Sequence, residues 1–210
     1  MPQPTRDAIV AAGQLRRYGR GEVVFHQGDV GDVLHLLRKG RAAARVTTPA
    51  GDTVTLRVMG VGDVFGELAL FSERHERTAS IVALEAVETL ALRRPAVDEV
   101  RRAHPDFDDA LLEMLARRVD HLSQLVAEAH FVPADRRVAR RLYEVGRLYL
   151  GDGIPVTVPL TQEDLAAMAG TTRSTANQAL QKLGELGVLS LSRGRIEIVD
   201  PHALRQRAGW

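Results

Sequence analysis

Glycines divide the first half of the chain into short runs of β-forming residues. Between Gly21 and about Leu92 these runs are EVVF, VLHLL, AAARV, TVTLRVM and ETLAL. Short strands separated by glycine turns are typical of an antiparallel barrel or sandwich. The segment GELALFS lacks the alternation of a strand, and we expect one short helical turn there.

From Asp106 to about His130 the pattern changes to that of a single helix. Apolar residues recur there at alternating spacings of three and four, which makes a seam of about two and a half heptads. The seam consists of Leu112, Leu115, Val119, Leu122, Val126 and Ala129. Spacing alone leaves two interpretations open, a helix packed on its own domain and a parallel dimer helix.

Pro133 interrupts this helix, and a new helix is expected from there to Gly151, with a hinge between the two. Further on, the sequence predicts a short β-run, IPVTVPL, and two helical stretches around Gly170. A β-hairpin is expected in VLSLSRGRIEIV, with Arg193 and Gly194 at its turn.

Composition excludes several classes of protein. The chain has no cysteine, which removes disulfides, zinc–thiolate sites and iron–sulfur clusters. Apolar residues make up 45% and charged residues 26%, so the chain can bury a core and is not disordered overall. No apolar run approaches the ~20 residues of a membrane span, and no signal pattern opens the chain, so we expect a cytoplasmic protein.

The stretch LTQEDLAAMAGTTRSTANQALQKLGELGVL has the pattern of a helix-turn-helix. Thr161 and Thr172 are placed to cap the two helices, and Gly170 permits the sharp turn between them. The alternative is two ordinary helices with a polar exterior. The hairpin that follows favours a winged arrangement, which places cationic residues near DNA phosphates.

The outward face of the second helix carries hydrogen-bonding side chains suited to the major groove. Arg173 is the candidate for a bidentate contact to guanine, and Gln178 for a contact to adenine. Ser174 and Asn177 are further candidates for base contacts. The expected phosphate contacts are Thr172, Lys182, Arg193 and Arg195.

Residues 65–83, FGELALFSERHERTASIVA, form the densest motif of the chain. A glycine, a short helical turn and the pair Arg77–Thr78 make a compact cradle for an anion. Glu67 would repel phosphate but accept hydrogen bonds from a ribose hydroxyl, so a cyclic nucleotide satisfies both requirements. Without further information, a salt bridge from Arg77 to a glutamate at a strand end remains the alternative.

These residues resemble the phosphate-binding cassette of cyclic-nucleotide-binding domains, in which G-E-L-A-L is followed by R-T-A. From about residue 14 to 205 the chain resembles the Crp/Fnr superfamily of regulators. The resemblance implies an α+β fold with an N-terminal cyclic-nucleotide-binding β-roll (a double-stranded β-helix or jelly roll), a long dimerisation helix and a C-terminal winged helix-turn-helix. The expected domains are residues 1–105, 106–132 and 133–210.

The resemblance also assigns roles to residues. Gly66 and Glu67 are expected to hold the ribose, and Arg77 and Thr78 the cyclic phosphate. The predicted ligand-binding set is Gly66, Glu67, Leu68, Arg77, Thr78 and Ser123.

Two departures from the family pattern stand out. Leu122 and Ser123 occupy the positions where cyclic-AMP-responsive members have a Thr–Ser pair that reaches the adenine, so one hydrogen-bonding group for the base is missing. The recognition helix keeps Arg173 but has Ser174 and Gln178 in place of two other base-contacting residues. We therefore expect a two-fold symmetric DNA site that keeps the arginine-contacted G·C pair and differs elsewhere.

The sequence thus predicts a homodimeric transcription factor that is controlled by cyclic AMP or a related cyclic nucleotide, with RNA polymerase as a further partner, no obligatory cofactor, no metal and no membrane. One alternative is the same regulator acting without a ligand or with another effector. A remote alternative is an enzyme that uses Glu67, Arg77 and Ser72 or His75 on a phosphorylated substrate; no catalytic or metal-ligand spacing supports it.

Overall fold

The computed structural model describes residues 2–51, 53–152, 154–192 and 194–209. The chain divides into two compact units, Met1–Thr53 with Arg57–Leu122, and Val54–Leu56 with Ser123–Trp210. Within the described residues, no helix is long and apolar enough to cross a bilayer.

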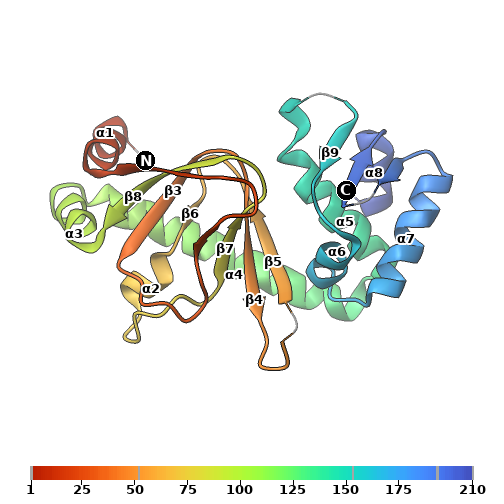
Figure 1. The fold of residues 1–210 in the computed structure, drawn as a ribbon, viewed down its shortest axis with the longest axis horizontal. Coiled ribbons are helices and arrows are strands. Elements are labelled where there is room, and N and C mark those ends of the chain that lie inside the picture. Colours follow the sequence, from red (N-terminus) through yellow and green to blue (C-terminus); the bar gives the residue numbers. More distant parts are fainter. Residues whose placement is uncertain (1, 52, 153, 193, 210) are drawn as a thin grey trace. The chain divides into compact units, whose positions relative to one another are not determined.

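The N-terminal part is a β-roll of two four-stranded sheets with antiparallel pairing (Figure 1). One sheet has the order β1-β8-β3-β6 and the other β2-β7-β4-β5. The strands are β1 (Gln14–Tyr18), β2 (Val23–Phe25), β3 (Val33–Lys39), β4 (Ala42–Thr47), β5 (Thr53–Met59), β6 (Val64–Phe65), β7 (Ser80–Ala83) and β8 (Val87–Arg93). The expected β-roll, with strands in all five β-forming runs, is confirmed.

Helices cover and extend this roll. α1 (Gln3–Ala12) and α3 (Arg94–Ala103) contact each other, as Figure 1 shows, and the short α2 (Glu67–Phe71) confirms the helical turn expected in GELALFS. A buried apolar cluster joins these helices to β3 and β8. Its members are Ile9, Leu34, Leu70, Leu90, Leu92, Val97, Val100 and Phe107.

A second cluster fills the interior of the roll. It comprises Leu37, Ala42, Ala44, Met59, Phe65, Ile81, Ala83 and Val87. His35 lies beside it with only 5% of its surface exposed. The His35 ring stacks on Phe65 with centroids 5.0 Å apart, and its Nδ1 lies 3.1 Å from the hydroxyl oxygen of Thr89.

The long helix α4 (Asp106–Phe131) confirms the helix expected from Asp106 onward. Its successor α5 (Ala134–Arg147) begins directly after Pro133, as expected. The prediction that this second helix reaches Gly151 is wrong. The chain tightens at its end, where the amides of Leu148 and Tyr149 bond three residues back, and a 3-10 turn follows at Leu150–Asp152.

The C-terminal part contains the predicted helix-turn-helix and hairpin. After α5 come β9 (Val156–Val158), α6 (Gln162–Met168), α7 (Arg173–Glu185), β10 (Leu189–Ser192), β11 (Arg195–Ile198) and α8 (Pro201–Ala208). The three strands form an antiparallel sheet in the order β10-β11-β9, which makes the wing of a winged helix. The fold class expected from the sequence is therefore confirmed.

The state of His35 leads to a prediction about acid stability. Burial, with smaller effects of Arg77 and Arg16, lowers the pKa of His35 from 6.5 to about 3. Between these two pKa values His35 is protonated in the unfolded chain but neutral in the folded chain. The free energy of unfolding therefore falls as the pH drops below about 6.5. We expect a slope approaching about 1.4 kcal/mol per pH unit from this group in urea unfolding between pH 6.5 and 5.

In the same measurement, His35→Phe removes that slope, whereas replacing the exposed His202 by Gln leaves it unchanged. An identical pH dependence in His35→Phe and the wild type would contradict the assignment.

Candidate functional site

The phosphate cassette begins at Gly66, whose φ of 86° lies in the left-handed region that favours glycine. A Cβ atom here would collide with the Arg77 guanidinium and lie 2.8 Å from the Val33 carbonyl oxygen. Glycine is thus required for two reasons, backbone conformation and the close passage of Arg77. The sequence-based choice of Gly66, Glu67 and Arg77 as one cluster agrees with this geometry.

Arg77 is a buried cation with 6% of its surface exposed. Its guanidinium donates to the carbonyl oxygens of Gly66 and Val33, both at 2.8 Å, and lies 4.0 Å from the centroid of the Phe25 ring. Burial lowers its pKa, and the more distant Asp32, Glu67 and Asp29 act in the opposite direction.

The two carbonyl oxygens accept hydrogen bonds from Arg77, but they do not neutralise its positive charge. Within the described part of the chain, no carboxylate lies within ion-pair distance of the guanidinium. The alternative of an Arg77–glutamate salt bridge is therefore wrong. A guanidinium has five N–H donors, and the geometry leaves some of them for an anion.

Glu67 has its partner on the long helix instead. It is 2% exposed, and its carboxylate forms an ion pair with Arg118 of α4, which also donates to the Val64 carbonyl oxygen at 3.3 Å. The sequence did not predict a role for Arg118 in this site. No local signal separates this arginine from the other charged residues of α4, because its partner lies 51 positions away in the chain.

The other predicted ligand residues are more exposed. Leu68 is 44% exposed on α2, and Thr78 is exposed just before β7. Ser123 is exposed on α4, five positions after Arg118. Their contacts with a ligand stay predictions.

The apolar seam of α4 faces away from the protein's own core. Four of its members are exposed by between 54% and 64%: Leu112, Val119, Leu122 and Val126. Leu115 is half-buried and Ala129 is exposed. Of the two interpretations of the seam, packing on its own domain does not agree with this exposure, because an apolar stripe of this length is normally covered.

Both helices of the helix-turn-helix begin at the predicted threonine caps. Thr161 and Asp164 form a reciprocal capping box at α6, and Thr172 accepts a hydrogen bond from the Thr175 amide at α7. Gly170 adopts a φ of 58° in the turn. From α5, the Arg137 guanidinium donates to the carbonyl oxygens of Ala169, Gly170 and Val132, which ties this turn to the end of α4.

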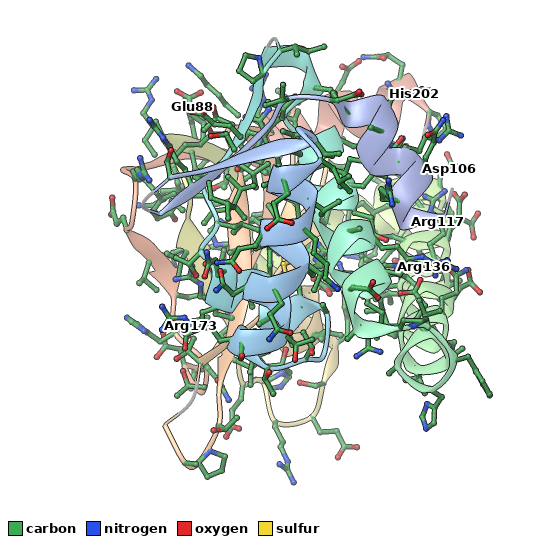
Figure 2. The ribbon with its side chains drawn as sticks, turned by 90° about the vertical axis from the view of Figure 1, so that its right-hand side faces the viewer. Glu88, Asp106, Arg117, Arg136, Arg173 and His202 are labelled. Carbon is green, nitrogen blue, oxygen red and sulfur yellow. The ribbon has the colours of Figure 1, made fainter. Side chains whose placement is uncertain are left out.

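Arg173 lies at the start of α7, on the surface (Figure 2). The other exposed DNA-binding candidates are Thr172, Ser174, Gln178, Lys182 and Arg195, and Asn177 is half-buried. Arg193 lies outside the described residues.

A groove of about 330 Å³ brings Arg173 and Arg195 together. It lies between the start of α6 and the wing, and Gln162 and Ser192 also line it. One predicted base-contacting residue, Arg173, and one predicted phosphate-contacting residue, Arg195, thus line the same groove. In the described parts of the chain, no group of three or more His, Asp or Glu side chains could hold a metal ion.

Comparisons with known proteins place both parts of the chain in families. Residues 15–104 match the cyclic nucleotide-binding domain, and residues 136–207 match the Crp-like helix-turn-helix domain. The chain is 34% identical over 202 residues to the cyclic AMP receptor protein of Thermus thermophilus, covering 96% of this chain and 91% of that protein. It is 31% identical to the CRP-like cAMP-activated global transcriptional regulator of Mycobacterium tuberculosis, covering 91% and 86% of the two chains.

Two solved structures resemble this chain. The catabolite activator protein of Thermus thermophilus matches with a TM-score of 0.57 and 32% identity, covering 100% of this chain and 96% of that one. The regulator CLP of Xanthomonas campestris matches with a TM-score of 0.78 at 20% identity, covering 94% and 99%, a likeness that concerns the fold alone.

The ion pair between Glu67 and Arg118 leads to a second prediction. Arg118→Met leaves the Glu67 carboxylate buried without its partner, which should destabilise the N-terminal part by about 3 kcal/mol. The double variant Glu67→Gln/Arg118→Met removes the stranded charge and should regain part of that loss. Urea unfolding followed by circular dichroism measures both. The control is Arg117→Met, which breaks the exposed ion pair of Arg117 with Glu113. Equal effects of Arg118→Met and Arg117→Met would contradict the role given to this pair.

Proposed function

The chain belongs to the Crp/Fnr family of DNA-binding transcriptional regulators, and we propose that it acts as a homodimer whose promoter binding is controlled by a cyclic nucleotide. Its relatives are transcription regulators and not enzymes, so the alternative of an enzyme that acts on a phosphorylated substrate is set aside. The observation that carries the proposal is the environment of Arg77. It is a buried cation beside Gly66, whose backbone adopts the left-handed conformation, and its guanidinium has N–H donors left for an anion.

Cyclic AMP or a related cyclic nucleotide fits the residues of the cassette. Arg77 and Thr78 supply donors for the cyclic phosphate, and the Glu67 carboxylate is an acceptor for a ribose hydroxyl. Two of the relatives named above are, by their names, a receptor of cyclic AMP and a regulator activated by it. Because Arg118 already holds Glu67, a ligand that binds Glu67 must share or replace this contact.

Dimerisation is supported by the exposed seam of α4. Its spacing of three and four is that of a coiled-coil helix, and a second copy of the same helix is complementary to it in length and chemistry. Leu122 strengthens such a seam while offering no hydrogen bond to a base. A regulator that is active without a ligand therefore remains the second candidate, and the ligand titration below separates the two.

In the proposed mechanism, the ligand acts on α4 through Glu67 and Arg118. A change in that helix reaches the hinge between Phe131 and Ala134, where Arg137 bonds the Val132 carbonyl and the helix-turn-helix turn. Ligand binding would thereby set the spacing of two recognition helices on a two-fold symmetric DNA site. We place this activity in the cytoplasm, where RNA polymerase is the further partner.

Replacing Arg77 tests the ligand. Arg77→Ala removes a charge-assisted contact of about 1.5–3 kcal/mol, so binding of cyclic AMP or cyclic GMP should weaken by roughly ten- to a hundredfold. Isothermal titration calorimetry measures it, and Arg74→Ala, an exposed arginine three positions earlier, is the matched control. Failure of the folded wild type to bind either nucleotide would leave the regulator that acts without a ligand or with another effector.

Replacing Arg173 tests the DNA site. Arg173→Ala should lower affinity for a selected site by about 1–3 kcal/mol and relax the preference at one G·C pair, with less effect on non-specific DNA. Sites are selected from random DNA, and binding is measured at several salt concentrations. The exposed Arg205→Ala on α8 should keep the wild-type preference. A G·C preference that survives in Arg173→Ala would rule out this residue as the base contact.

A further inference from the structure

Arg57 of β5 is an arginine on the inward face of the roll. Side chains alternate along a strand, so Arg57 shares its face with Met59, which is 1% exposed in the interior cluster. The Arg57 side chain itself is 31% exposed. An inward-facing arginine requires a reason, because arginines are rarely buried without a partner.

The hydrogen bonds of Arg57 are incomplete. Its Nη2 atom is buried and has no hydrogen-bond partner in the described part of the chain. The nearest carboxylate is that of Asp63, at 3.8 Å, which is an ion pair without a hydrogen bond. Buried donors of this kind are normally satisfied.

Other charged side chains lie near the Arg57 guanidinium. Burial and the neighbouring Arg118 lower the pKa of Arg57, and Asp63 and Glu67 act in the opposite direction. Arg118 has an incomplete set of bonds too, because its Nε is buried without an acceptor among the described residues. Arg118 pairs with the buried carboxylate of Glu67, Arg57 lies near enough to feel its charge, and each of the two arginines has a buried nitrogen without a hydrogen-bond acceptor among the described residues.

The position of β5 indicates which part of a nucleotide Arg57 would meet. In the sheet β2-β7-β4-β5, one strand separates β5 from β7, and Arg77 and Thr78 lie shortly before the start of β7 at Ser80. Two strand spacings are about 10 Å, which is comparable to the distance from phosphate to base in a mononucleotide. β5 is thus two strands away from the strand that follows the phosphate-binding pair, and the charges near Arg57 include that of Glu67, the residue predicted to hold the ribose.

We propose that Arg57 determines base specificity by donating to the O6 and N7 atoms of a guanine, so that the site prefers cyclic GMP to cyclic AMP. A guanidinium has donors only. Guanine presents two adjacent acceptors that pair with it, whereas adenine presents an amino donor next to N7. The inference rests on the proposed function, because it concerns the base of the same cyclic nucleotide.

The test is a calorimetric titration of the full chain with cyclic GMP and cyclic AMP, in the wild type and in Arg57→Met. We expect the wild type to bind cyclic GMP at least tenfold more tightly. Arg57→Met should lose roughly ten- to a hundredfold in affinity for cyclic GMP and change less than about threefold for cyclic AMP. Arg38→Met, an exposed arginine of β3, is the control for loss of charge.

A second variant and a second measurement protect the test against misfolding. Arg57→Lys keeps the positive charge but not the paired donors, and it should lose the preference while the protein stays folded. Thermal unfolding should show the same order, with a larger ligand-induced rise in Tm for cyclic GMP than for cyclic AMP in the wild type alone.

The outcomes separate the two proposals. Cyclic AMP binding with no preference for cyclic GMP, or an equal loss for both nucleotides in Arg57→Met, overturns the role of Arg57 and leaves the proposed function standing. Binding of neither nucleotide by the folded wild type overturns both. Preference for cyclic GMP that disappears in both Arg57 variants, together with loss of both ligands in Arg77→Ala, supports both.

Discussion

Two charges of opposite sign, Glu67 and Arg77, are buried in one short cassette without neutralising each other. Buried charges need partners, and each of these finds its partner elsewhere. Glu67 is paired by Arg118 of α4, and Arg77 is held by the carbonyl oxygens of Gly66 and Val33. The partners thus come from α4, from β3 and from the backbone at Gly66.

In the proposed mechanism, the long helix is therefore part of the sensor. Arg118 contacts the cassette, while the neighbouring Val119 and Leu122 belong to the exposed apolar seam. A ligand that competes for Glu67 acts on the helix that carries the proposed dimer contact. The proposal therefore couples ligand binding to dimer assembly through one carboxylate, without a long path of intermediate residues.

In the DNA-binding part, hydrogen bonds fix the recognition surface. Threonine caps start α6 and α7, and the three bonds of Arg137 hold the turn between them. The apolar side of α7 is buried by Ala176, Ala179, Leu180 and Leu183, so its polar residues have to point outward. Arg173 and Arg195 meet at one groove because the wing packs beside the start of α6.

The sequence by itself determined the features that depend on neighbouring residues. Glycine-separated runs predicted five of the eight strands of the roll, Thr161 and Thr172 predicted the helix starts, and the cassette motif predicted the cluster of Gly66, Glu67 and Arg77. The domain boundaries and the contacts of individual residues with ligand and DNA stay predictions. Period, capping and turn chemistry act over a few residues, which is why such signals can be found in one sequence.

Only the tertiary structure decided which distant groups meet. The sequence patterns did not predict the helices α1, α3 and α8 or the strands β1, β6 and β7. The partner of Glu67 is 51 residues away in the chain. The inward-facing Arg57 has its proposed role in the site only because the fold brings β5 close to Arg118. The strength of a charge's interactions depends on burial and on the charges around it, and both are set when the sheets and α4 pack together.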